Sequence, residues 1–496
     1  PYAGTPNVRY RLGVVEIESG DIQWIPLGDD DLYIPRVHWT PDSAEVLFQR
    51  QSRDQQTLEL VAHDLDRDRQ RILIRDQSDT WINLHDDLHV LDNGQFIWSS
   101  ERSGHRHLYL HDRDGERVRP LTAGAWPVAS LAAVDEDLGL VYFTAGIETP
   151  AEQQLYRQSL VTATPEAVQE VSRRGGWHDV SFDRTGRRYL DLFSSVDQPP
   201  QLSLHSADGD RLAWLVENHL DESHPYAPFL DRHRPTEFGT LEAADGQALH
   251  YRIMRPAGFD PAKRHPVFIH VYGGPTSRMV VNRWGRRHLF DQYMASQGYI
   301  VFSLDNRGIA GQGVAFQAPA WLNLGRIEVE DQMVGVEYLK SLDYVDPERI
   351  GVFGWSYGGY MTLMMLMQHP GEFAAGVSVA PVTDWALYDT HYTERYLGMP
   401  RDEDGQPTEA YRRGNVLEYA GQLSDPLLLI HGMADDNVLF THSTLLMQQL
   451  QQEAIDFELM TYPGEKHAIA GPGQRLHVYR QIDRFFQRHL MEDECS

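Results

Sequence analysis

The sequence predicts a multidomain chain in which an all-β half is followed by an α/β half with a mostly parallel sheet. Two patterns support this prediction. Short alternating segments separated by Asx-Gly turns fill residues 1–227, and compact apolar runs alternating with helical patterns fill residues 228–496. The 496 residues suit two or three domains at roughly 100–200 residues each. We therefore expect the domain boundary between residues 227 and 228.

Closely spaced strands and turns characterise the first half. Strands are expected at Val37–Phe48, Phe96–Ser99, His107–His111 and Val141–Thr144. The segments "WTPDSAEVLF" and "VSFDRTGRRYLDLF" share an aromatic residue, an Asp, a small-residue turn and a returning strand. Such a repeat favours the blades of a β-propeller, with a β-sandwich as the alternative. At roughly 40–50 residues per blade, this half holds four or five blades.

The second half alternates buried strands with helices. The strands are expected at Phe268–Val271, Tyr299–Leu304, Arg349–Phe353, Leu427–Ile430 and Phe457–Thr461. Between them, Val329, Met333, Val336 and Leu339 fall on one face of a helix. Strands that alternate with helices in this way predict a mostly parallel sheet covered on both sides.

Composition excludes several classes of function. Lys and Arg number 44 against 72 Asp and Glu, a net charge of −28, which argues against a nucleic-acid partner. No apolar run approaches the roughly 20 residues of a membrane span. The single cysteine, Cys495, rules out an intrachain disulfide and a Cys-based zinc site. The histidines show no ligand-like pairing, and His105–His107 is expected to be a solvated strand, so we expect neither a metal nor a cofactor.

The segment "RIGVFGWSYGGYMTLMMLMQ" carries the strongest chemical signal. It places the pattern G-x-S-x-G, from Gly354 to Gly358, between an expected strand and an expected helix. The turn is so tight that small residues are needed on both sides of the serine, whose Oγ is then exposed above the sheet. This context predicts an α/β-hydrolase with Ser356 as its nucleophile.

A serine hydroxyl needs a base that takes its proton, and in this fold the acid and the base follow the serine in that order. The strand "PLLLIHG" leads into "MADDNV", where Asp435 and Asp436 compete for the role of the acid. The strand and loop "FELMTYPGEKHAI" then supply His467 as the base. His431 is a rival base, but it lies at a strand end before the acid, and we interpret it as structural.

The oxyanion of the reaction needs hydrogen-bond donors. We expect one to be the backbone N–H of Tyr357, the residue after the nucleophile. The loop "YGGPTS" offers the other, because Gly273 and Gly274 permit close backbone approach and the Tyr272 hydroxyl can donate. The segment "GIAGQG" at 308–313 lacks the spacing of a dinucleotide-binding loop and receives little weight.

The segments "GWSYGGYM", "HGMADDNV" and "GEKHAI", in this order, resemble the dipeptidyl peptidase IV family of serine peptidases, and bacterial members in particular. The resemblance covers the whole second half, including "VYGGPTS", "LGRIEVEDQM" and "APVTDWALYDTHYTERYLG". It is looser in the first half, where "PYAGTPNV" and "SERSGHRHLYL" carry it. It implies the C-terminal blades of an eight-bladed propeller that caps an α/β-hydrolase domain. The implied activity is release of X-Pro dipeptides, and less readily X-Ala, from free N-termini through an acyl-enzyme.

The resemblance also implies roles for particular residues. The D-x-x-V spacing to Val438 selects Asp435 as the acid, beside Ser356 and His467, and Tyr272 with the Tyr357 amide forms the oxyanion hole. Asn437 matches a residue that binds the substrate near its N-terminal residue. The apolar proline pocket corresponds to Tyr357, Val382, Trp385, Tyr388, Tyr392 and Val438. Flat rings suit a pyrrolidine ring, which offers no donor. Without the resemblance, "DWALYDTHYTERY" is typical of an ordinary helix with core aromatics.

The sequence departs from the family in one respect. The family reads the substrate's ammonium group with two adjacent glutamates and holds its carbonyl with an arginine. All three lie upstream of the segment that "PYAGTPNV" matches, and the chain contains no Glu-Glu pair. We therefore expect that an N-terminal part is missing.

Four alternatives to the dipeptidyl activity remain open. They are a prolyl tripeptidyl peptidase, a prolyl oligopeptidase, a general esterase and a non-catalytic propeller interaction module. The resemblance further implies a homodimer formed through the hydrolase domain and its C-terminal helix at His477–Met491. It also implies a periplasmic location, with the cytoplasm as the alternative.

Overall fold

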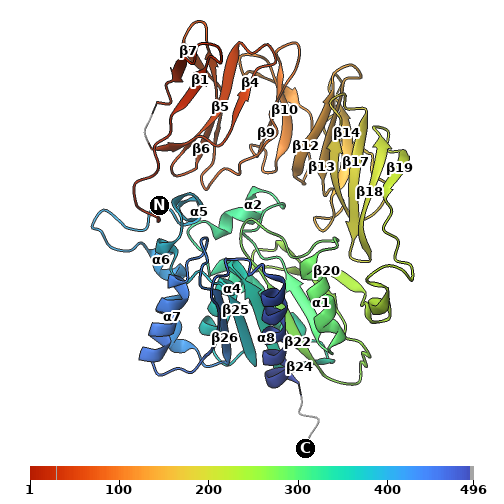
Figure 1. Cartoon of the computed structure of the whole chain (residues 1–496), viewed down its shortest axis with the longest axis vertical. Helices are drawn as coiled ribbons and strands as arrows, with labels where there is room; N and C mark the ends of the chain where they lie inside the picture. Colours follow the sequence, from red (N-terminus) through yellow and green to blue (C-terminus); the bar gives the residue numbers. More distant parts are fainter. Residues whose placement is uncertain (29–30, 163, 492–496) are drawn as a thin grey trace, which may run out of the picture.

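The computed structural model describes residues 1–28, 31–162 and 164–491 (Figure 1). Cys495, which bears on disulfides and zinc, lies outside these residues. Figure 1 shows two stacked parts: the strands of the first half, red to yellow, lie above an α/β domain drawn in green to blue. This division follows the change of pattern along the sequence.

Antiparallel sheets that follow one another along the chain build the described part of the first half. The first strands form a two-stranded ribbon, β1 (Leu12–Val15) and β2 (Ile22–Ile25), and then a five-stranded sheet. That sheet contains β3 (Leu32–Tyr33), β4 (Val37–Trp39), β5 (Glu45–Ser52), β6 (Thr57–Asp64) and β7 (Arg69–Gln77).

Three four-stranded sheets complete this half. Their strands are β8 (His89–Val90), β9 (Phe96–Ser100), β10 (His107–His111) and β11 (Arg117–Pro120); β12 (Val128–Asp135), β13 (Leu140–Ala145), β14 (Gln154–Ser159) and β15 (Gln169–Glu170); and β16 (Trp177–Phe182), β17 (Arg188–Ser195), β18 (Gln198–Ser206) and β19 (Arg211–Val216). In each sheet, strands consecutive in sequence are neighbours. Successive four-stranded meanders are the arrangement of propeller blades.

The turn and returning strand expected in "WTPDSAEVLF" are confirmed, so that Val37–Phe48 is a hairpin and not one strand. Strands β4 and β5 pair antiparallel, with Val37 opposite Phe48 and Trp39 opposite Val46. The turn between them is closed by Asp42, whose Oδ1 accepts the Ala44 N–H at 3.1 Å. The Asx turn in the sequence therefore sets the register of this pair.

The prediction of a solvated strand at His105–His107 is wrong for His107. This residue begins β10 and is only 1% exposed. Its ring nitrogens lie 3.0 Å from Thr122 Oγ1 and 3.0 Å from the Gly124 carbonyl oxygen. Both partners come from the segment after β11, so local sequence gave no sign that the imidazole is buried and satisfied.

The second half contains an eight-stranded sheet in the order β20-β21-β23-β22-β24-β25-β26-β27. Its strands are β20 (Thr236–Glu242), β21 (Ala248–Met254), β22 (His265–Val271), β23 (Ile300–Leu304), β24 (Val345–Trp355), β25 (Ala375–Val379), β26 (Leu427–Gly432) and β27 (Glu458–Tyr462). From β23 to β27 all neighbours are parallel, whereas β20 and β21 run antiparallel at one edge. The predicted mostly parallel sheet is confirmed.

Helices cover both faces of this sheet. The helices of this half are α1 (Arg286–Ser296), α2 (Val314–Gln317), α3 (Ile327–Lys340), α4 (Tyr357–Gln368), α5 (Thr390–Leu397), α6 (Glu409–Gly414), α7 (Thr441–Gln452) and α8 (Pro472–Leu490). Short 3-10 turns are η1 (Ala227–Arg232), η2 (Ala318–Ala320), η3 (Trp385–Leu387), η4 (Val416–Glu418) and η5 (Ala420–Gln422). Side chains of α3, α4 and α7 share one buried core, and those of α1 and α8 share another.

The two halves are joined between Val216, where β19 ends, and Thr236, where β20 begins. The boundary expected at residues 227 and 228 falls within this link and stays a prediction. Among the described residues, no helix combines the length and the apolar character that crossing a membrane requires.

Candidate active site

Ser356 occupies a sharp turn between a strand and a helix. Strand β24 ends at Trp355 and α4 begins at Tyr357, so that Ser356 alone connects them. Its backbone lies at φ 61° and ψ −119°, a conformation that costs a residue with a side chain on the order of 1–3 kcal/mol. The Ser356 N–H donates to the Val379 carbonyl oxygen at 2.8 Å, which anchors the turn to β25.

Two glycines make this turn possible. A Cβ atom on Gly354 would lie 2.1 Å from the Gly358 carbonyl oxygen, and one on Gly358 would lie 2.4 Å from the Val271 carbonyl oxygen. Both approaches are too close for any side chain. The requirement for small residues on each side of Ser356 is thus visible in the backbone itself.

The structure pairs Asp435 with His467. His467 Nδ1 lies 2.7 Å from Asp435 Oδ2, and Asp435 Oδ1 accepts the N–H groups of Asn437 at 2.9 Å and Val438 at 3.0 Å. Burial alone would raise the pKa of Asp435, but hydrogen bonds from His431 and His467 outweigh it and lower the pKa below its usual range. Asp435 is therefore an ionised acceptor that fixes the imidazole of His467.

Asp436, the competing carboxylate, points elsewhere. Its side chain is exposed and forms an ion pair with Lys466. Asp435, by contrast, has a fully buried side chain. The geometry thus favours Asp435 as the acid, as the D-x-x-V spacing implied.

His431 is buried behind the acid. Its Nε2 lies 2.9 Å from the Val438 carbonyl oxygen and 3.2 Å from Asp435 Oδ2, and its Nδ1 lies 2.7 Å from Ser443 Oγ. A carbonyl oxygen only accepts, so Nε2 carries a proton and also donates toward Asp435. This arrangement suits a residue that orients the acid, in line with the structural interpretation of His431.

Ser356 and His467 open into one cavity of about 1010 Å³, whose wall also includes Tyr272 and Asn437. The Trp355 indole N–H donates to the His467 carbonyl oxygen at 3.0 Å, which ties the loop of the base to the residue before the nucleophile. The cavity therefore brings together the expected nucleophile, base and oxyanion donor.

Of the two expected oxyanion donors, Tyr357 directly follows Ser356 in the chain and Tyr272 lines the same cavity as Ser356. Tyr357 is the first residue of α4, where backbone N–H groups have no partner within the helix. The Tyr272 ring follows β22 and lies 6.1 Å from the Tyr357 ring. A Cβ atom on Gly274 would lie 2.7 Å from Tyr357 Cγ, so this glycine allows the loop to pack against the elbow.

The six expected pocket residues belong to one buried core or pack against it. Ring centroids lie 5.5 Å apart for Tyr357 and Trp385, 5.9 Å for Trp385 and Tyr392, and 5.6 Å for Tyr388 and Tyr392. Val382 and Val438 are buried in the same core. Tyr388 Oη donates to Asn437 Oδ1 at 2.7 Å, so the aromatic cluster meets the cavity wall at Asn437.

The segment "DWALYDTHYTERY" is not one helix. It forms η3 and α5, each with an aspartate cap: Asp384 accepts the Ala386 N–H at 2.9 Å and Asp389 accepts the Tyr392 N–H at 2.8 Å. Tyr388 lies between them in extended conformation. The ordinary-helix interpretation is therefore wrong, because two side-chain caps compete with a continuous helix here.

Sequence reasoning missed Glu328. This fully buried residue of α3 accepts the Tyr357 hydroxyl at 2.5 Å and the Gly325 N–H at 2.9 Å. Burial raises the pKa of Glu328 to about 7. The available signal was its position next to Val329 on the face predicted to be buried, where a carboxylate requires specific partners.

An elbow serine, a His–Asp pair and a mostly parallel sheet define this domain as a serine-type α/β-hydrolase. Residues 288–493 match the prolyl oligopeptidase family, and residues 1–200 match the dipeptidyl peptidase IV N-terminal region. The crystal structure of Porphyromonas gingivalis dipeptidyl peptidase 4 is 30% identical, with a TM-score of 0.91, and the match covers 99% of this chain and 68% of that one.

Dipeptidyl peptidase 8 of Mus musculus and that of Homo sapiens are each 32% identical over 99% of the chain. This chain belongs to the dipeptidyl peptidase IV family. It spans 62% of the length of these two mammalian relatives.

Proposed function

We propose that the full-length protein is a serine dipeptidyl aminopeptidase that releases X-Pro, and less readily X-Ala, dipeptides from free peptide N-termini. The observation that carries the proposal is the Asp435–His467 pair in the cavity that Ser356 also lines, beside a cluster of aromatic rings. The names of the relatives, which are dipeptidyl peptidases, support the release of dipeptides.

In the proposed reaction, His467 takes the proton of Ser356 Oγ as the oxygen attacks the carbonyl carbon of the proline residue. Asp435 holds Nδ1–H of His467 at 2.7 Å, which leaves Nε2 as the base. The Tyr272 hydroxyl and the Tyr357 N–H stabilise the oxyanion. His467 then protonates the departing amine, and water releases the dipeptide from the acyl-enzyme.

Proline selection is assigned to the aromatic cluster. The pyrrolidine ring would fill the pocket of Trp385, Tyr388 and Tyr392, while Asn437 would bind near the substrate's N-terminal residue. Tyr388 supports this arrangement because its hydroxyl holds the Asn437 side chain at 2.7 Å. The flat faces of these rings offer dispersion contacts that an alanine side chain fills only in part.

Three broader features belong to the same proposal. The four sheets of three or more strands in the described part of the first half would be the C-terminal blades of an eight-bladed propeller. A homodimer would form through the hydrolase domain and α8, and the location would be periplasmic, both in line with bacterial members of the family.

The test compares hydrolysis of Gly-Pro-nitroanilide with that of its N-acetylated form by the full-length protein. Cleavage of only the free-amine substrate supports a dipeptidyl aminopeptidase. Equal cleavage of both would replace it with a prolyl oligopeptidase. Ser356→Ala should remove nearly all turnover and all labelling by a fluorophosphonate probe without unfolding the protein; retained turnover would refute the assignment of the nucleophile.

One observation favours a second candidate activity, that of a prolyl tripeptidyl peptidase. Because the 496 residues contain no Glu-Glu pair, they offer no counterpart of the family's ammonium-reading residues. A prolyl tripeptidyl peptidase would release three residues from a peptide with proline at position three. Mass analysis of the products of such a peptide, beside one with proline at position two, distinguishes the two activities.

A further inference from the structure

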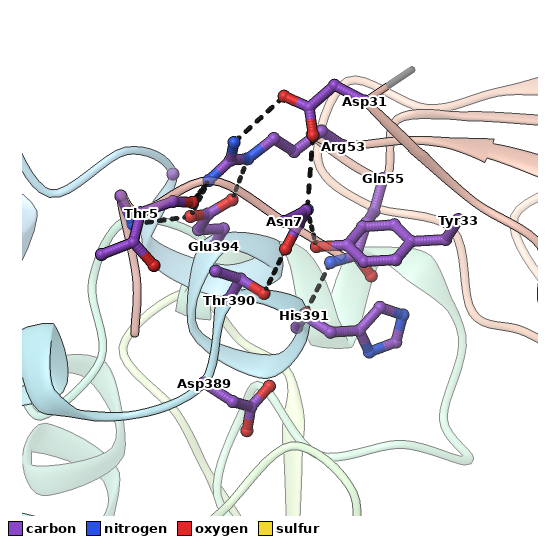
Figure 2. Close-up of polar contacts among 12 residues, drawn as sticks. Thr5, Asn7, Asp31, Tyr33, Arg53, Gln55, Asp389, Thr390, His391 and Glu394 are labelled. Carbon is purple, nitrogen blue, oxygen red and sulfur yellow. Dashed lines mark hydrogen bonds and ion pairs between the residues drawn. The ribbon is translucent and has the colours of Figure 1, made fainter. Parts of the chain in front are cut away.

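The N-terminal segment of the chain, Pro1–Asn7, lies against helix α5 of the α/β domain (Figure 2). It pairs with the helix start through the backbone: the Ala3 N–H donates to the Tyr388 carbonyl oxygen at 2.9 Å, and the Thr390 N–H donates to the Pro1 carbonyl oxygen at 3.1 Å. Tyr388 is a residue of the proposed proline pocket. The segment is therefore attached to the pocket wall itself.

An ion pair with a residue of the first half also holds helix α5. Arg53, in the turn between β5 and β6, donates from Nε to Glu394 Oε2 and from Nη2 to Glu394 Oε1, both at 2.8 Å. Glu394 Oε1 also accepts the Gly4 N–H at 2.7 Å, and the Glu394 side chain is only 2% exposed. A buried, two-pronged pair of this kind fixes orientation as well as distance.

Contacts of Gln55 and Tyr33 extend this attachment along α5. Gln55 donates to the His391 carbonyl oxygen at 2.5 Å and accepts from Arg395 Nε at 2.6 Å. The Tyr33 ring lies 4.7 Å from the His391 ring, edge to face. Figure 2 shows these residues of the first half gathered on one side of the helix.

Helix α5 depends on such contacts for its position. It has eight residues, and helices shorter than about 12–15 residues are marginal without tertiary packing. Tyr392 of this helix stacks on Trp385 at 5.9 Å, while Glu394 is held by Arg53. A rotation or shift of α5 would therefore move Tyr392 relative to Trp385.

We propose that Arg53 and Glu394 are positioning residues that hold the proline pocket in shape, so that proline selection depends on the five-stranded sheet of the first half. Arg53 lies 341 residues before Glu394 and acts through α5. The inference rests on the proposed function, because it concerns the pocket of that activity.

The experiment measures kcat/KM of the full-length protein for Gly-Pro-nitroanilide and for Gly-Ala-nitroanilide. Alanine fills less of the pocket, so the ratio of the two constants reports pocket shape and is insensitive to a general loss of active enzyme. A 1 Å misplacement can cost about 100-fold in rate. We expect Arg53→Gln to lower the proline-to-alanine ratio on the order of tenfold, mainly through KM for the proline substrate.

Arg53→Lys is the conservative variant. It keeps the charge beside Glu394 but loses the two-pronged geometry, so its ratio should lie between those of Arg53→Gln and the wild type. Asp179→Asn is the matched control, because it removes a different arginine–carboxylate contact between the two halves, with Arg283, and should leave the ratio unchanged. Labelling of Ser356 by a fluorophosphonate, which does not require proline, should proceed at the wild-type rate in all folded variants.

Three outcomes would overturn the inference. The first is an unchanged proline-to-alanine ratio in Arg53→Gln. The second is a drop of this ratio in Asp179→Asn as large as that in Arg53→Gln. The third applies if Arg53→Gln does not fold, and is a wild-type ratio in Arg53→Lys. The last would make the pair a contact for stability alone. Failure of the proposed function is separate, since the wild-type protein would then either leave Gly-Pro-nitroanilide intact or cleave its N-acetylated form equally well.

Discussion

Replacing Asp435 with asparagine should disable the proposed catalytic centre while preserving its volume. Asp435 Oδ1 accepts two backbone N–H groups, and Oδ2 accepts from His467 and His431. Every partner of this side chain is thus a donor. An amide has one acceptor oxygen only, so its NH₂ group must face donors on whichever side it lies.

The orientation that keeps the backbone bonds turns the amide NH₂ toward His467. Nδ1 of His467 must then accept, which moves the ring proton to Nε2 and removes the base from Ser356. The neighbouring His431 cannot relieve the conflict, because the Val438 carbonyl oxygen keeps a proton on its Nε2. The wrong tautomer in a comparable triad costs about 10⁴-fold in kcat, which corresponds to about 5.5 kcal/mol in activation free energy.

The assay is the steady-state hydrolysis of Gly-Pro-nitroanilide by Asp435→Asn, with Asp436→Asn as the matched control. Asp436 is exposed and is paired with Lys466, so its amide should retain nearly all activity. A loss smaller than tenfold in Asp435→Asn would refute the assigned acid. An equal loss in both variants would show that the effect comes from the loop and not from the tautomer of His467.

Three further predictions follow from neighbouring contacts. Tyr272→Phe should lower kcat by about 10²–10³ if its hydroxyl stabilises the oxyanion, whereas an unchanged kcat would leave the ring a packing role. Burial raises the pKa of Glu328 from 4.5 to about 7, so the folded chain holds a proton that the unfolded chain has lost, and stability falls as pH rises through this window. The unfolding free energy of Glu328→Gln minus that of the wild type should therefore rise by on the order of 3 kcal/mol between pH 4.5 and 8. Denaturant unfolding of both proteins would contradict this if the difference were the same at every pH. Gly354→Ala, whose Cβ would lie 2.1 Å from the Gly358 carbonyl oxygen, should lower the unfolding temperature sharply, and a wild-type melting curve would show that the elbow can open.

The sequence predicted those features of the molecule that depend on residues close together in the chain. The turn at Ser356 follows from glycines two residues away on each side, and the β4–β5 hairpin follows from its own Asx turn. The order of the acid and the base along the chain follows from the strands that precede them. Each of these features is defined within a short segment, where spacing and residue type determine the backbone.

Other features depend on partners that are distant in the sequence. His107 looked solvated because its partners follow the next strand, and Glu328 was overlooked because its partner Tyr357 lies 29 residues later. Arg53 and Glu394 lie 341 residues apart, and a single sequence contains no signal for such a contact. The interruption of the expected helix at Tyr388 is different, because its causes are local. Both capping aspartates are visible in the sequence, but the run of aromatic residues favoured one continuous helix.

The backbone conformation of Ser356 exposes its hydroxyl group at a cost in the conformational stability of the domain. Its φ of 61° is strained for serine and is readily adopted by glycine. Ser356→Gly should therefore give a protein that is inert yet harder to unfold than the wild type. The gap between the two unfolding free energies would measure how much conformational stability the domain gives up in order to expose one hydroxyl group.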